Sequence, residues 1–166
     1  MDSRIVQKFT LLLKVKGRLF MKRIGILTSG GDCQGLNAAI RGVCKTLYNH
    51  YKKDEIEIYG IIDGYRGLIT GEYRLMKPED FSGILTRGGT ILGTSRQPFK
   101  LMRVIDEENN VDKVAAMKAN YKKMKLDCLV ILGGNGTQKS ANMLSQEGLN
   151  VVSLPKTIDN DLWGTD

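Results

Sequence analysis

The segment RIGILTSGGDCQGLNAAIRG, residues 23–42, joins a short apolar run to a helical pattern through a glycine-rich turn. RIGIL at 23–27 is typical of a buried strand. After the turn, apolar residues recur at helical spacing and predict a helix that ends near Tyr51; they are Leu36, Ala39, Ile40, Val43 and Leu47. A strand, a glycine turn and a helix form the unit from which parallel sheets are built.

The rest of the chain repeats this order. Apolar runs predict further strands at EIEIYGII (55–62), CLVIL (128–132) and NVVSL (150–154), with a short extended piece near 72–76. Three helical stretches are expected: one opening at Pro78, one carrying Val114, Met117, Tyr121 and Met124, and one capped by Thr137 that ends near Gly148. This alternation predicts an α/β fold, a Rossmann-like parallel sheet with helices on both faces.

Composition and charge limit the classes of function. The 166 residues are 42% hydrophobic and 26% charged, and no apolar run is long enough to span a membrane. Residues 1–20 carry five basic residues and one acidic residue, so they contribute +4 of the net charge of +7. The remainder is mildly basic, without an aromatic-rich RNA signature or a helix-turn-helix pattern, which favours anionic small molecules over nucleic acid. Three cysteines without metal-ligand spacing indicate a reduced, cytoplasmic protein.

Two regions are therefore expected. Residues 1–20 form a leader that is disordered or results from an upstream start, although an amphipathic targeting segment is an alternative. Residues 21–166 form a nucleotide- or phosphate-binding domain.

Three glycine-rich segments lie where phosphate-binding loops are expected: TSGGDCQG (28–35), RGGTILGTSR (87–96) and GGNGT (133–137). Glycines let backbone N–H groups approach a phosphate, and a following helix N-terminus adds a favourable dipole. None matches the GxGxxG or GxxxxGK[ST] pattern. Each loop alone is compatible with a tight strand–helix connection, whereas three at the carboxyl edge of one sheet favour a phosphate site.

The segment PKTIDND, residues 155–161, follows the last predicted strand. If it is extended, Thr157, Asp159 and Asp161 share one side. Two carboxylates and a hydroxyl beside a phosphate site are suited to accept an alcohol proton and to position Mg²⁺. The alternative is an acidic surface loop. The pattern favours phosphoryl transfer to a hydroxyl.

Together these segments resemble the 6-phosphofructokinase family. The similarity extends over essentially all of residues 21–166, in family order and spacing, through MKRIGILTSGGDCQGLNAAIRG, IDGYRGL, RGGTILGTSR, ILGGNGT and LPKTIDND with GTD at 164–166. The resemblance implies the N-terminal half of the phosphofructokinase fold. It also implies a glycolytic reaction: transfer of a phosphoryl group from ATP, with Mg²⁺, to the C1 hydroxyl of fructose 6-phosphate, giving fructose 1,6-bisphosphate.

The resemblance also implies roles for individual residues. Gly31 and Arg96 would contact the transferring phosphoryl group, and Asp159 would be the base, assisted by Thr157. The nucleotide site would include Gly31, Tyr65, Arg96, Gln97, Gly134, Asn135, Gly136 and Thr137. The sugar would meet Thr157, Ile158 and Asp159, and Asn135 and Asp161 would hold the metal.

The chain departs from the family pattern at three points. Asn135 replaces an aspartate that many members carry. Donor choice in the family follows two positions, matched here by Gly136 and Lys156: ATP users have glycine at both, and pyrophosphate users have Asp and Lys. The mixed pair favours ATP over pyrophosphate, because an aspartate at position 136 would crowd and repel the α-phosphate of a nucleotide.

The third departure is length, since family chains run about twice as far. The chain is accordingly expected to be an N-terminal fragment that is inactive alone, with the full-length protein a homo-oligomer or a second chain supplying the other half. Two alternatives remain open: an NAD or diacylglycerol kinase with a similar GGNGT loop, and a non-catalytic nucleotide-binding fragment.

Overall fold

The computed structural model describes residues 21–105 and 111–162. The predicted leader, residues 1–20, and the terminal Asp166 lie outside the described residues. The strands are β1 (Lys22–Ser29), β2 (Ile56–Ile61), β3 (Tyr73–Met76), β4 (Cys128–Gly133) and β5 (Val151–Pro155). The α-helices are α2 (Gly35–His50), α3 (Tyr65–Thr70), α4 (Lys113–Lys123) and α5 (Asn135–Gln146), with 3-10 turns η1 (Pro78–Phe81) and η2 (Phe99–Leu101).

The five strands form one sheet in the order β3-β2-β1-β4-β5. β1 pairs in parallel with β2 and β4, and β4 pairs in parallel with β5. Only β3 runs antiparallel, at the edge beside β2. The predicted parallel sheet is therefore confirmed, with one antiparallel edge strand that the sequence pattern did not distinguish.

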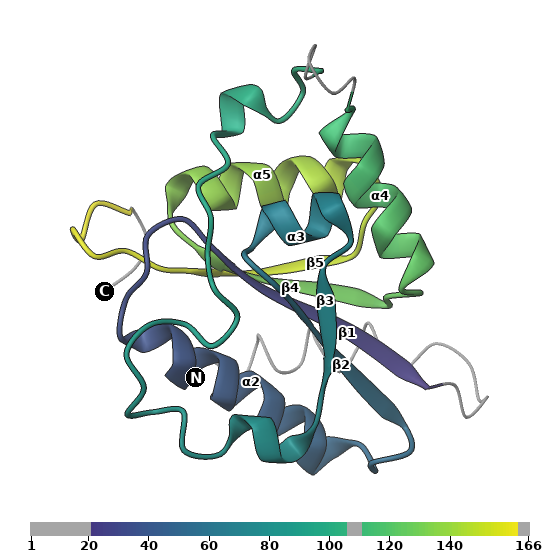
Figure 1. Ribbon diagram of the computed structural model, residues 1–166, viewed down its shortest axis with the longest axis vertical. Coiled ribbons are helices and arrows are strands. Elements are labelled where there is room, and N and C mark those ends of the chain that lie inside the picture. The colour runs from purple at the N-terminus through teal and green to yellow at the C-terminus, as the bar shows by residue number, and fades with distance from the viewer. Residues whose placement is uncertain (1–20, 106–110, 163–166) are drawn as a thin grey trace.

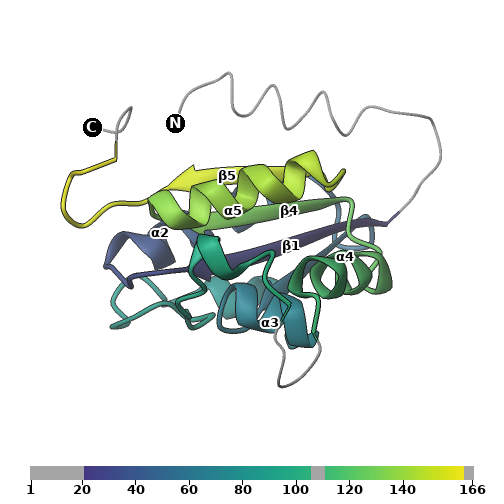
Figure 2. The same ribbon diagram turned by 90° about the horizontal axis from the view of Figure 1, so that it is seen from above.

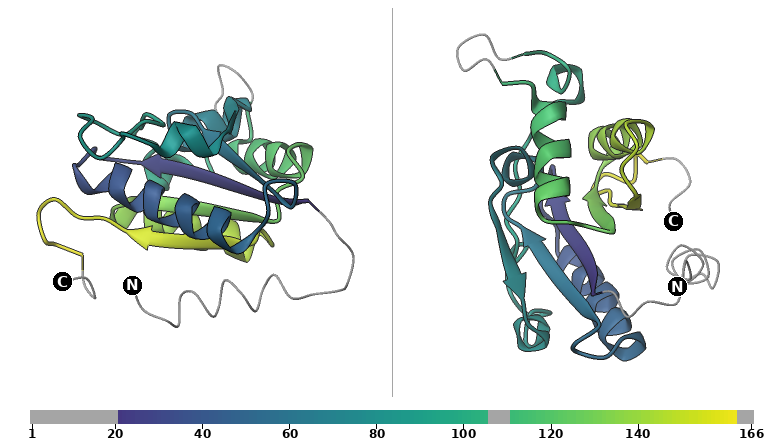
Figure 3. Two further views of the ribbon diagram at one scale, coloured as in Figure 1. Left: turned by 90° about the horizontal axis from the view of Figure 1, so that it is seen from below. Right: turned by 90° about the vertical axis from the view of Figure 1, so that its right-hand side faces the viewer.

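Helices cover both faces of the sheet, as predicted (Figure 1). On one face α2 and η1 pack against a core that includes Ile24, Ile26 and Ile40. Figure 3 (left) looks onto this face, with α2 in dark blue in front of the strands. On the other face α3, α4 and α5 pack against Leu27 and Ile131. Because every residue of β4 is buried, its continuous apolar sequence is what a central parallel strand requires.

The sequence pattern assigned no element to DGYRGL, where α3 begins at Tyr65 after Asp63 and Gly64 turn the chain with positive φ angles. The helix expected to open at Pro78 does begin there, but it is the single 3-10 turn η1. One local prediction was wrong. Thr137 does not cap α5, because the helix begins at Asn135. Its hydroxyl instead donates to the backbone oxygen of Ser29, which ties α5 to the end of β1.

None of the described helices is both long and apolar enough to cross a membrane.

The ends of β1 and β4 approach so closely that one position tolerates no side chain. Ser29 and Gly133 are register partners, and a Cβ atom on Gly133 would lie 2.5 Å from the Ser29 carbonyl oxygen and 2.6 Å from the Thr137 side chain. By contrast, a Cβ atom on Gly136 would meet nothing within 4 Å. These two glycines, three positions apart, form a matched pair for mutation.

We expect Gly133→Ala to lower the free energy of unfolding by about 1–3 kcal/mol, because the new methyl group overlaps backbone that cannot move independently. Gly136→Ala should be neutral or stabilising by up to about 1 kcal/mol, since alanine favours a helix. Urea unfolding followed by circular dichroism measures both variants. Equal effects of the two substitutions would contradict the close packing at Gly133.

Candidate functional site

Three segments meet at the carboxyl edge of the sheet: the loop after β1, residues 87–96, and the chain after β5. Figure 2 shows them at the same end of the sheet. The 87–96 segment does not directly follow a strand, yet it is bound to the end of β1. The Gly30 N–H donates to the Ser95 oxygen at 3.1 Å, and the Thr94 hydroxyl donates to the Gly30 oxygen at 2.6 Å.

Two polar residues of the first loop and α2 hold the front of the 87–96 segment. The Asp32 carboxylate accepts from the Thr90 N–H at 3.1 and 3.2 Å. Asn37, only 3% exposed, accepts from the Ile91 N–H at 2.9 Å and donates to the Gly89 oxygen at 2.7 Å. Sequence reasoning assigned no role to either residue. An asparagine at a position next to the apolar stripe of α2 was the available signal.

The end of β2 holds the other part of this segment. Asp63 has a positive φ of 53°, which is uncommon for a residue with a side chain. Its N–H donates to the Leu92 oxygen at 2.8 Å, and its own oxygen accepts from the Ser95 hydroxyl at 2.6 Å. Leu92 and Ser95 both precede Arg96 in the chain. The backbone that leads to this arginine is therefore held by the turn after β2 as well as by the end of β1.

Beneath the site, Tyr65 and Thr137 form a buried connection. The Tyr65 hydroxyl donates to the Thr137 backbone oxygen at 2.9 Å, and the tyrosine side chain is fully buried. Burial also raises the pKa of Tyr65, so the phenol stays protonated and can donate. The resemblance placed Tyr65 along the nucleotide site. In the structure it supports that edge from the core, through Thr137, rather than projecting from it.

The N-terminus of α5 is open toward the same edge. Gly134 precedes the helix without a side-chain cap, and Asn135 and Gly136 are exposed. A helix N-terminus with uncapped N–H groups attracts anions through both hydrogen bonding and the helix dipole.

Lys156 connects the end of β5 to the first loop. Its ammonium donates to the Gly31 oxygen at 2.6 Å, across 125 positions of sequence, and its backbone N–H donates to the Gly133 oxygen at 3.0 Å. The lysine side chain therefore lies against the loop that carries Gly31, and it joins the third segment to the site.

The acidic segment after Lys156 bends rather than continuing as an extended strand. Asn160 has a positive φ of 53°, and the Thr157 hydroxyl donates to the Asp161 carboxylate at 2.7 Å and accepts from the Asp161 N–H at 3.2 Å. The segment does not take the extended form under which Thr157, Asp159 and Asp161 would share one side, because hydrogen bonds between Thr157 and Asp161 close a turn. Thr157 and Asp161 still meet, through this turn.

The turn leaves two neighbouring side chains exposed. Ile158 is 62% exposed, and its Cδ1 atom lies 3.5 Å from the place where a Cβ atom of Gly31 would be. The exposed Asp159 carboxylate has no hydrogen-bond or ion-pair partner within the part of the chain that the structure describes. The Arg96 side chain is exposed, and Gln97 beside it is half-buried. The edge thus presents the unpaired Asp159 carboxylate, the Asp161 carboxylate held by Thr157, the Arg96 guanidinium and the uncapped start of α5.

Comparison with known proteins identifies relatives of the whole described domain. The Phosphofructokinase family pattern matches residues 23–166. The chain is 63% identical, over 147 residues, to an ATP-dependent 6-phosphofructokinase of Spirochaeta thermophila, covering 87% of this chain and 39% of the relative. It is 54% identical to ATP-dependent 6-phosphofructokinase 3 of Bacteroides thetaiotaomicron, covering 87% of this chain and 41% of the relative.

The solved phosphofructokinase of Saccharomyces cerevisiae superposes with a TM-score of 0.73 at 29% identity, covering 87% of this chain and 21% of that chain. The chain thus spans about two fifths of the length of the curated bacterial relatives named above. The match decides against the NAD-kinase and diacylglycerol-kinase alternatives.

We expect Asn37→Ala to release the 87–96 segment while the sheet remains folded. The variant removes the acceptor of the Ile91 N–H and the side-chain donor of the Gly89 oxygen. Hydrogen exchange should therefore become at least about tenfold faster at the Ile91 amide, which corresponds to a local loss of about 1.4 kcal/mol. Amides of β1 and β4 should keep their protection.

Asn49→Ala is the matched control, since Asn49 is exposed near the end of the same helix. An unchanged exchange rate at Ile91 in Asn37→Ala would show that Asn37 does not hold the segment.

Proposed function

Because this chain belongs to the phosphofructokinase family, we propose that it forms the phosphoryl-donor site of a 6-phosphofructokinase and supplies the base for transfer from ATP to the C1 hydroxyl of fructose 6-phosphate. One observation carries this proposal: the bond from Lys156 to the Gly31 oxygen, which brings the acidic turn beside the first glycine loop. A base and a phosphate-binding loop must be neighbours for phosphoryl transfer to an alcohol.

We assign donor binding to the backbone and side chains of the carboxyl edge. The N–H of Gly31 and the open first turn of α5, at Gly134, Asn135, Gly136 and Thr137, suit phosphate oxygens. Arg96 is exposed at the end of the 87–96 segment, where it suits charge that develops on the transferring group. Gln97 follows it. Tyr65 contributes through its bond to Thr137.

Mg²⁺ suits the oxygen groups at this edge. Mg²⁺ is commonly held by one or two protein oxygens together with substrate phosphates, so a cluster of three acidic or histidine ligands is not required. No group of three or more His, Cys, Asp or Glu side chains that could hold a metal ion occurs among residues 21–105 and 111–162. We propose Asn135 and Asp161 as the protein ligands. Asp161 has one carboxylate oxygen engaged by Thr157, which orients the group. Bound there, the metal would neutralise phosphate charge.

The acidic turn divides its tasks among three residues. Asp159, exposed and unpaired among the described residues, is the proposed acceptor of the C1 hydroxyl proton. Thr157 holds the turn through Asp161, so its contribution to the sugar site is to position Asp159. Ile158 presents an apolar surface beside Gly31, where the sugar would enter.

The structure favours ATP over pyrophosphate as the donor on two grounds. Position 136 is open, because a Cβ atom there would meet nothing within 4 Å. The Lys156 ammonium is directed to the Gly31 oxygen, so a lysine at this position does not need the space in front of α5. A nucleotide would then have room for its α-phosphate at the helix N-terminus.

We expect Gly136→Asp to weaken MgATP binding at least about tenfold while pyrophosphate binding falls less. A Cβ atom at position 136 meets no atom within 4 Å, and the carboxylate it carries would stand where the α-phosphate is proposed to bind. An unfavourable contact of about 1.4 kcal/mol is a factor of ten. Isothermal titration of the purified chain with each ligand, in the presence of Mg²⁺, measures both affinities.

Gly42→Asp is the control. It adds the same charge at an exposed helical glycine that also has open space around its Cβ position, in the middle of α2. Clearly tighter binding of pyrophosphate than of MgATP by the unmodified chain would overturn the choice of donor, and no binding of either would overturn the proposed site.

Turnover is a separate prediction. The chain spans about two fifths of its bacterial relatives, and we propose that most contacts to the sugar phosphate come from the other part of such proteins. The purified 166-residue chain should therefore bind MgATP but phosphorylate fructose 6-phosphate negligibly in a coupled assay. A rate comparable to that of the Spirochaeta thermophila enzyme, assayed in parallel, would contradict this division of the site.

A further inference from the structure

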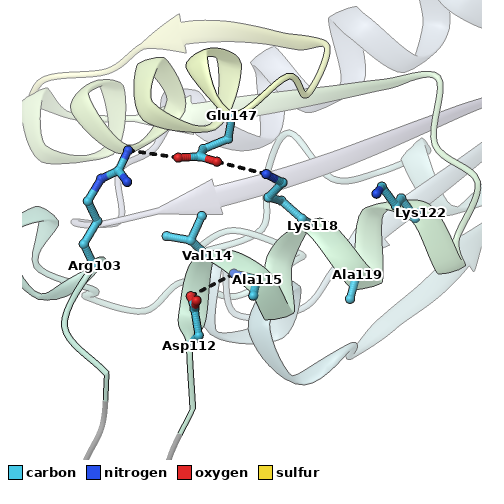
Figure 4. Close-up of a pocket in the computed structure, with 8 residues that line it drawn as sticks. All are labelled: Arg103, Asp112, Val114, Ala115, Lys118, Ala119, Lys122 and Glu147. Atoms are coloured by element: carbon cyan, nitrogen blue, oxygen red, sulfur yellow. Dashed lines mark hydrogen bonds and ion pairs between the residues drawn. The ribbon is translucent and has the colours of Figure 1, made fainter.

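A hollow lies away from the carboxyl edge, between α4, the end of α5 and the chain after η2 (Figure 4). Its volume is about 470 Å³, within the range of small-molecule sites. It is lined by Arg103, Asp112, Val114, Ala115, Lys118, Ala119, Lys122 and Glu147. Three basic side chains from two segments converge on it, which distinguishes it from an ordinary surface groove.

A carboxylate of the protein already occupies one end of this hollow. One oxygen of Glu147 accepts from Arg103 at 3.0 Å, and the other accepts from Lys118 at 2.9 Å. These two donors lower the pKa of Glu147, Lys118 having the larger effect. Arg103 and Lys118 thus each bind one oxygen of the Glu147 carboxylate, and the same two donors could bind the oxygens of another anion.

The hollow continues beyond Glu147 toward a cation that is not paired. Lys122 lies one helical turn after Lys118 on α4 and has no ion-pair partner in the described part of the chain. Val114, Ala115 and Ala119 provide an apolar wall beside the two lysines. The other acidic group, Asp112, uses its carboxylate to cap α4 at the Ala115 N–H, 2.9 Å away. It is therefore already engaged at the start of the helix.

We propose that this hollow binds a small phosphate monoester, with the phosphate held by Lys118 and Lys122 and the organic part lying on Val114 and Ala119. Glu147 competes with the phosphate for Lys118. Without a bound phosphate, Glu147 stays paired with both Lys118 and Arg103. Two lysines, with Arg103 on the far side, suit a phosphate dianion better than they suit a singly charged carboxylate. Each phosphate oxygen can accept a separate charged hydrogen bond.

This site is separate from the proposed donor site. Glu147 follows the C-terminal end of α5, whereas the donor site is at the N-terminal end, Asn135. Twelve residues of helix place the two about 18 Å apart. Ligand binding at one location can therefore be distinguished from binding at the other.

The test uses the purified chain and glycerol 3-phosphate, with glycerol as the neutral match, followed by amide NMR shifts. We expect saturable shifts at Val114–Lys123 with glycerol 3-phosphate and none with glycerol. Lys122→Gln should weaken this binding about fivefold, the effect of losing one partly exposed charge contact, while Lys123→Gln changes it less than about twofold. Lys123 is also exposed on α4 but does not line the hollow.

Glu147→Gln separates a binding site from a merely structural ion-pair cluster. Removing the competing carboxylate should tighten glycerol 3-phosphate binding about fivefold. All three positions are at least partly exposed, so folded variants are expected, and circular dichroism checks this. Shifts confined to Gly133–Thr137, equal losses in Lys122→Gln and Lys123→Gln, or no gain in Glu147→Gln would each overturn the proposal.

Discussion

The close approach of β1 and β4 at Ser29 and Gly133 brings together the first glycine loop and the start of α5. The two strands are parallel neighbours in the centre of the sheet, so the loops that follow them leave side by side. With no side chain at Gly133, the Thr137 hydroxyl can reach the Ser29 oxygen and fasten the first turn of α5 to β1. The first glycine loop and the N-terminus of α5 consequently face the same space, and Lys156 adds the end of β5 to it.

Residues at this edge fall into two groups with different burial. Asn37, Tyr65 and Thr137 are buried, and each forms hydrogen bonds to backbone groups of the loops. Arg96 and Asp159 are exposed and have no ion-pair partner within the described residues, so their charged groups are open to a ligand. A buried polar group is stable only when it is hydrogen-bonded, and that requirement makes the supporting residues rigid. Buried, hydrogen-bonded support beneath exposed charged side chains is an arrangement that suits the proposed phosphoryl-transfer site.

The sequence was sufficient to predict the parallel sheet and the gathering of the glycine loops at its carboxyl edge, because strand burial and strand direction follow from local apolar patterns. It was not sufficient for features that depend on tertiary hydrogen bonds. The bend at Asn160 results from a positive φ and from the Thr157–Asp161 bond, whereas the sequence was considered only for an extended PKTIDND. The role of Asn37 depends on Gly89 and Ile91, more than fifty positions away, which no local pattern could indicate.

The bond of Lys156 to Gly31 also changes how the mixed Gly136–Lys156 pair should be understood. A lysine at the phosphate edge adds positive charge whichever donor binds, so its charge alone does not discriminate between ATP and pyrophosphate. What discriminates is the space that each residue leaves. The Lys156 ammonium is held by a backbone oxygen of the first loop, 2.6 Å away, and Gly136 leaves the start of α5 open. The proposed donor choice therefore rests more on the absence of a side chain at position 136 than on the presence of a cation at position 156.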